Sequence, residues 1–91
     1  MLMRNVFTRK NIQLLKDWGE KDKDIEQIKR AYKKLKLYDE NNERIHKDEA
    51  IKKIGIKEFL SGLVRASFHF TAFREYENGK GILFDCSDLF C

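Results

Sequence analysis

The first part of the chain repeats apolar residues at the spacing of an α-helix. Within residues 9–18, RKNIQLLKDW, apolar side chains recur at intervals of three residues, at Ile12, Leu15 and Trp18. Thr8 precedes this segment and belongs to the residue types that cap helix N-termini, and Gly19 is suited to end a helix in a left-handed turn. The pattern therefore predicts a first helix over about residues 9–18.

A second helix is expected after the short polar link EKDK. Asp22 or Asp24 is placed to cap it. Its apolar residues have the spacing 3, 4, 3 and form one stripe, Ile25, Ile28, Tyr32 and Leu35. Two helices with so short a connection predict a helical hairpin.

The pattern changes after this stripe. Leu35 and Leu37 alternate with lysines, and Asn41 and Asn42 tolerate the positive φ of a tight turn. We therefore expect the helix to stop near Lys34 and a short extended hairpin to follow.

Two further helices are predicted in the middle of the chain. The segment 46–55, HKDEAIKKIG, fits a short helix that Gly55 closes, although His46 is a poor substitute for the Ser or Thr of a capping box. The segment 57–66, KEFLSGLVRA, fits another helix. Its expected buried residues are Phe59, Leu60, Leu63 and Val64.

The stretch 65–75, RASFHFTAFRE, fits two structures. A long helix to Asn78 would place apolar residues at spacings of 4, 3, 4 and 3, at Phe59, Leu63, Ala66, Phe70 and Phe73. However, Asn78–Gly79 is the dipeptide that a two-residue type I′ turn prefers. We favour a helix that ends near Ala66 and a hairpin over about residues 69–85, with Phe73 opposite Phe84.

These elements predict a single domain over residues 1–91 of the α+β class. An N-terminal helical hairpin and further short helices would pack on a small C-terminal antiparallel hairpin or sheet. The 91 residues include 42% hydrophobic ones, enough for a thin core without disulfides. The sequence holds no apolar run near the roughly 20 residues of a membrane span, so we expect no membrane partner.

The charge is unevenly distributed. Residues 1–36 hold eleven Lys and Arg and five Asp and Glu, a balance of +6, whereas residues 37–91 hold eight and ten, a balance of −2. A positive field of this kind favours nucleic acid, a nucleoprotein or an acidic protein surface as partner. The candidate contact residues are Lys29, Arg30, Lys33, Lys34, Lys36, Arg9 and Lys10.

The basic segment has a second interpretation. Asp22, Asp24 and Glu26 come early in its helix and the basic residues come late, which is the order that the helix dipole favours in any solvated helix. Weaker candidates for a contact are Arg65, His69 and Arg74, which stand among phenylalanines. Exposed aromatic rings beside cations can stack bases of single-stranded nucleic acid. With seven phenylalanines in so short a chain, we instead expect most of the rings in the core.

Catalytic and metal-binding signatures are missing from the sequence. His69 has hydroxyl residues nearby, Ser67 and Thr71, but no nucleophile motif such as GxSxG occurs. The histidines and cysteines lack the spacing of a zinc site. We therefore predict no catalytic residues, no cofactor and no metal. Cys86 and Cys91 are too few for a secreted disulfide framework, so we expect reduced thiols and a cytoplasmic location.

The sequence thus favours a small non-enzymatic basic protein that contacts nucleic acid or a nucleoprotein through its N-terminal helical half. The alternative is an inhibitor or regulator of phage or mobile-element type, similar in role to anti-CRISPR proteins. Such a protein would bind a host defence complex without touching nucleic acid. A small enzyme ranks last, and the oligomeric state is left open.

Overall fold

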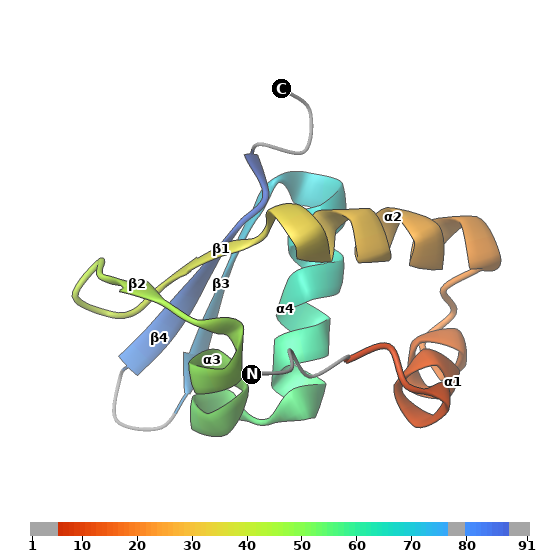
Figure 1. Cartoon of the computed structure of the whole chain (residues 1–91), viewed down its shortest axis with the longest axis horizontal. Helices are drawn as coiled ribbons and strands as arrows, with labels where there is room; N and C mark the ends of the chain where they lie inside the picture. Colours follow the sequence, from red (N-terminus) through yellow and green to blue (C-terminus); the bar gives the residue numbers. More distant parts are fainter. Residues whose placement is uncertain (1–5, 77–79, 88–91) are drawn as a thin grey trace.

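The chain forms four helices and a four-stranded antiparallel sheet, an α+β fold (Figure 1). The computed structural model describes residues 6–76 and 80–87. Along the chain the elements are α1 (Arg9–Asp17), α2 (Asp22–Lys34), β1 (Lys36–Tyr38), β2 (Arg44–Ile45), α3 (Lys47–Ile54), α4 (Ile56–His69), β3 (Thr71–Tyr76) and β4 (Lys80–Asp85). The predicted fold class is confirmed.

The sheet has the strand order β2-β1-β4-β3. β1 therefore lies beside β4, although more than forty residues separate them along the chain. α3 and α4 lie on one face of the sheet, and α2 crosses α4 and reaches the end of the sheet where β1 begins (Figure 1). The structure is thus built as a small sheet with a layer of helices on one face.

The core is one cluster to which every layer contributes. A series of ring contacts crosses it: Phe7 meets Tyr32 at 5.4 Å, Tyr32 meets Phe59 at 6.3 Å, and Phe59 meets Phe84 at 5.6 Å between ring centroids. These rings join the segment before α1 to α2, α4 and β4. The predicted stripes are confirmed at the buried residues Ile25, Ile28, Leu35, Phe59, Leu60 and Leu63.

The first two helices begin and end close to the predicted residues. Thr8 caps α1, because its hydroxyl oxygen accepts the backbone N–H of Asn11 at 3.2 Å, and Gly19 has the expected positive φ of 97°. The predicted cap of α2 is wrong: Lys21 is the N-cap residue. Asp24 lies inside the first turn, where its carboxylate accepts the backbone N–H of Lys21 at 3.2 Å.

The predicted short hairpin after α2 is confirmed as β1 and β2. The Asp39 carboxylate accepts the backbone N–H groups of Asn41 at 2.8 Å and Glu43 at 2.9 Å, and Asn42 takes a φ of 62°. These hydrogen bonds, that from Glu43 foremost, lower the pKa of Asp39. The side chain therefore stabilises the turn in its ionised form.

α4 is longer than predicted and ends abruptly. It continues three residues past Ala66 to His69, because the next residue, Phe70, has a φ of 71° that cannot continue a right-handed helix. The backbone oxygen of Phe70 instead accepts the N–H of Cys86 at 2.6 Å. The alternative of one helix to Asn78 is therefore wrong, and the preferred hairpin is present as β3 and β4.

The register of that hairpin differs by one residue from the prediction. Ala72 lies opposite Phe84, and Phe73 lies opposite Leu83. The turn at Asn78–Gly79, from which the register was predicted, is outside the described residues. Because cross-strand partners share a face of the sheet, Ala72 faces the helices and Phe73 faces away from them.

Packing against α4 explains this register. Gly62 of α4 approaches the buried Phe84 ring so closely that a Cβ at position 62 would lie 2.5 Å from it. The ring already fills this part of the core, so the small Ala72 fits beside it where a second phenylalanine would not. Phe73 consequently packs its ring over Gly81 on the outer face and is 55% exposed.

The expectation that most phenylalanines of the stretch 65–75 are buried is also wrong. Phe68 and Phe70 are 44% and 47% exposed. Together with Phe73, all three rings of this stretch are therefore about half exposed, and the core phenylalanines come from elsewhere in the chain, at Phe59 and Phe84.

Candidate functional site

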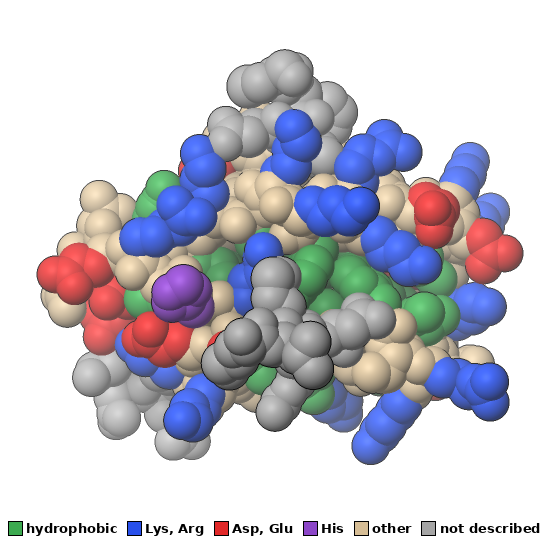
Figure 2. Space-filling model, viewed as in Figure 1, with side chains coloured by type: hydrophobic (Ala, Val, Ile, Leu, Met, Phe, Trp, Pro, Cys, Tyr) green, Lys and Arg blue, Asp and Glu red, His purple; other side chains and the backbone are tan. Residues whose placement is uncertain are grey.

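The solvent side of α2 carries most of the basic residues that the sequence singled out. Its opposite side is buried at Ile25, Ile28 and Ala31. Because successive helical residues turn by about 100°, Arg30, Lys33 and Lys34 project away from the core, and all three are exposed. Lys and Arg side chains gather along the upper part of the molecule, over α2 (Figure 2). We call these three residues the α2 basic cluster.

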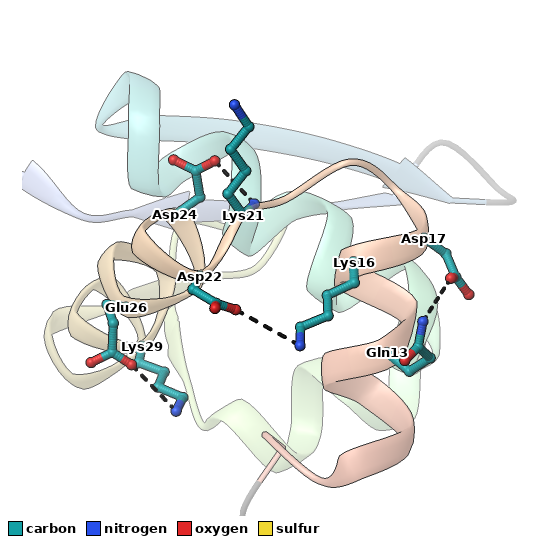
Figure 3. A network of polar contacts seen from close by, with 8 residues as sticks. All are labelled: Gln13, Lys16, Asp17, Lys21, Asp22, Asp24, Glu26 and Lys29. Atoms are coloured by element: carbon teal, nitrogen blue, oxygen red, sulfur yellow. Dashed lines mark hydrogen bonds and ion pairs between the residues drawn. The ribbon is translucent and has the colours of Figure 1, made fainter.

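The acids near α2 do not neutralise this cluster. Asp22 pairs with Lys16 of α1 at 3.7 Å, and Glu26 pairs with Lys29 at 3.5 Å (Figure 3). Within residues 6–76 and 80–87, the three residues of the α2 basic cluster form no ion pair. The charge of Lys29 is therefore partly offset, whereas the cluster is available to a partner.

Two groups of the predicted residues lie apart from the cluster. Lys36 does not share the helical arc on which it was predicted, because α2 ends at Lys34 and Lys36 begins β1, opposite Asp85. Arg9 and Lys10 are exposed in the first turn of α1, a helix that lies near the N-terminal end of α2 (Figure 1). The structure therefore does not bring all seven predicted residues into one row.

The weaker candidates, in contrast, do come together. Arg65, His69 and Arg74 border a shallow hollow of about 300 Å³ on the outer side of α4. Among the described residues it is lined by Ser61, Val64, Arg65, Phe68, His69 and Arg74. Arg74 donates to the Glu58 carboxylate at 2.6 Å, so its charge is neutralised within the chain.

Phe68 is the residue of this hollow that sequence reasoning missed. It was grouped with the core phenylalanines, although it lies five residues after Leu63 and nine after Phe59. These intervals turn it by about 140° and 180° around the helix from the two buried residues. A helical wheel would have indicated this exposure only if the helix had been continued past Ala66, near which it was predicted to end.

Ser67, one of the two hydroxyl residues near His69, is engaged within its own helix. The buried Ser67 hydroxyl donates to the backbone oxygen of Val64 at 2.7 Å, a bond within its own helix. Among the described residues, no group of three or more His, Cys, Asp or Glu side chains could hold a metal ion.

Cys86 is a free, fully buried thiol that packs between the sheet and α2. Its sulfur lies 3.7 Å from the backbone oxygen of Ala31, to which it donates. Burial, and secondarily the Asp85 carboxylate, raises the pKa of the thiol to about 11. The thiolate, which is the reactive form, is therefore strongly disfavoured in the folded chain.

This raised pKa predicts a loss of stability at high pH. The thiol ionises more readily in the unfolded chain than in the folded one. Its contribution to the stability of the fold is therefore complete below the pKa that it has in the unfolded chain, and is lost as the pH rises toward about 11. Between about pH 8 and 11, we expect the free energy of unfolding of the parent protein to fall by about 1–3 kcal/mol more than that of the Cys86→Val variant. Urea titrations at several pH values measure this slope, and identical pH profiles for the two proteins would contradict the prediction.

The described helices include none that is long and apolar enough to cross a membrane. In comparisons with known proteins, no family model, no curated protein and no solved structure matches this chain.

Proposed function

We propose that this chain is a small, non-enzymatic binding protein that contacts nucleic acid, free or within a nucleoprotein, through α2. The observation that carries the proposal is the α2 basic cluster. Arg30, Lys33 and Lys34 are exposed on one face and form no ion pair with the rest of the described chain. Cations arranged in this way can replace the counterions condensed on a phosphate backbone.

The helix dipole explains only part of this cluster. Lys33 and Lys34 lie in the last turn of α2, where a cation stabilises any helix by about 0.3–1 kcal/mol. Arg30 lies one turn earlier, where the dipole effect has faded. Its position therefore supports a role in contacting a partner.

A cytoplasmic location is part of the same proposal. The buried Cys86 is a free thiol with a raised pKa. Such a thiol suits a reducing compartment, where unpaired cysteines persist.

Reversing the charges of the α2 basic cluster tests the proposal. We expect the triple variant Arg30→Glu, Lys33→Glu and Lys34→Glu to lose binding to DNA or RNA at about 50 mM salt. For the parent protein, log affinity should fall linearly with log salt concentration, and these three contacts should account for about 2 to 3 units of that slope. Fluorescence anisotropy with labelled oligonucleotides measures both quantities, and circular dichroism checks that the variant is folded.

The matched control changes three other exposed lysines, Lys52, Lys53 and Lys57, to glutamate. This variant has the same net charge as the first, but its changes lie on α3 and at the start of α4. We expect it to keep most of the affinity. Equal losses in both variants would mean that net charge alone matters, and absence of binding by the parent protein to any DNA or RNA would overturn the proposal.

A further inference from the structure

The hollow beside α4 combines an exposed ring with basic residue types. Phe68 lines it together with Val64 and Ser61. The residue is 44% exposed, so part of its side chain is accessible to solvent. Arg65 and His69 stand next to this ring on the same helix. The lining, all of it within the described residues, contains no Asp or Glu.

The free positive charge of the hollow falls on Arg65. Arg74 is neutralised by Glu58, as described above, and its Nε atom is buried without an acceptor in the described structure. Arg65 is exposed and forms no ion pair with any described residue. An anionic group that entered the hollow would therefore meet Arg65 beside the Phe68 ring.

The α2 basic cluster lies toward the end of α4 that carries Phe68. The side-chain N–H of Gln27 on α2 donates to the backbone oxygen of Ser67 on α4 at 3.3 Å, so this side of α2 borders the end of α4 that carries Phe68. Arg30 and Lys34 follow Gln27 by three and seven residues and share its side of the helix. A single strand that extends from the hollow toward this end of α4 would therefore reach the cluster.

We propose that this hollow binds one unpaired base of a single-stranded nucleic acid, stacked on Phe68, while Arg65 holds a neighbouring phosphate. The proposal rests on the proposed function and names its substrate as a single strand. A duplex keeps its bases stacked on one another, whereas a single strand can turn a base onto an aromatic side chain.

The exposure of Phe68 differs in kind from that of Phe73. The Phe73 ring covers Gly81 on the outer face of the sheet, so packing accounts for its position. Phe68 instead borders an open hollow beside Arg65. Phe73 therefore serves as the matched control, since it is the same residue type, exposed to a similar extent, on another face of the molecule.

The test uses a fluorescent 12-nucleotide dT strand and a fluorescent GC-rich duplex of 12 base pairs, both at about 50 mM salt. We expect the parent protein to bind the single strand more tightly than the duplex. Phe68→Leu keeps an apolar side chain but removes the aromatic face, and we expect it to weaken binding to the single strand about tenfold. Phe68→Trp should retain the affinity, and Phe73→Leu should leave it unchanged.

A second variant tests the phosphate contact. We expect Arg65→Gln to weaken binding to the single strand and to reduce the salt slope by about 0.7, the value for one phosphate contact on a single strand. Because Arg65 is exposed on the helix surface, this change should not disturb folding.

The outcomes separate this inference from the proposed function. If the charge reversals on α2 abolish binding while Phe68→Leu and Arg65→Gln have no effect, the hollow is not a base site and the proposed function stands. Equal affinity for the single strand and the duplex would also overturn the inference. If the parent protein binds neither of the two DNA oligonucleotides and no RNA, the proposed function itself fails.

Discussion

Replacing Phe59 with alanine is expected to lower the free energy of unfolding by about 3–5 kcal/mol. The Phe59 side chain is fully buried, with its ring 5.6 Å from that of Phe84 and 6.3 Å from that of Tyr32. It thus joins α4 to both β4 and α2, and its removal leaves a cavity where three elements meet. A domain of this size has a stability of roughly 5–14 kcal/mol in total, so the loss is a large part of it. Urea or thermal unfolding, followed by circular dichroism, measures the change.

Phe68→Ala on the same helix is the control for this prediction. The chemical change and the gain in helix propensity are the same, but Phe68 is 44% exposed. We expect it to cost about 1 kcal/mol or less. Comparable losses in the two variants would show that Phe59 does not occupy the centre of the core.

Replacing Gly62 with valine is expected to destabilise the fold by about 3 kcal/mol, the upper part of the range for overpacked cores. A Cβ at this position would lie 2.5 Å and 2.6 Å from Cε1 and Cζ of Phe84 and 2.9 Å from Cγ of Arg74. The Phe84 ring is fully buried, so it can move only by displacing other side chains of a close-packed core. Glycine lowers helix propensity here by about 1 kcal/mol relative to alanine, yet close approach of α4 to the sheet requires it. Chemical denaturation measures the loss.

A double variant distinguishes this clash from a general effect on the helix. Phe84→Leu removes part of the ring that valine would meet, so Gly62→Val combined with Phe84→Leu should cost less than the sum of the two single changes. Additive losses would contradict the proposed contact. Ser61→Ala, at the neighbouring and partly exposed position, should change the stability by less than about 0.5 kcal/mol.

The α2 basic cluster could be predicted largely from the sequence. A helix that buries Ile25 and Ile28 must project Arg30 and Lys33 outward, because the helical period fixes their relative directions. The place of Lys36 could not be predicted in the same way, because it depends on β1 pairing with β4. That pairing joins residues far apart in the chain, so no local pattern indicates it.

The surface beside α4 required the folded structure. Arg65, Phe68 and His69 follow one another along one helix, but Arg74 reaches the hollow only because Phe70 turns the chain back into β3. The sequence suggested these residues only as weaker candidates, since a strand and a helix over residues 67–76 would distribute them differently. The end of α4 at His69 decides which of the rings face solvent.

The sequence by itself determined the elements whose signals are local. Apolar spacing, the Thr8 cap, and the glycines at the ends of α1 and α3 specify where these helices lie, because each depends on residues within one or two turns. The tertiary structure decided the strand register, the order β2-β1-β4-β3 and the exposure of Phe68, Phe70 and Phe73. A shift of one residue in register exchanges the two faces of a strand at little local cost. The close packing of Gly62 against Phe84 favours the face that carries the small Ala72.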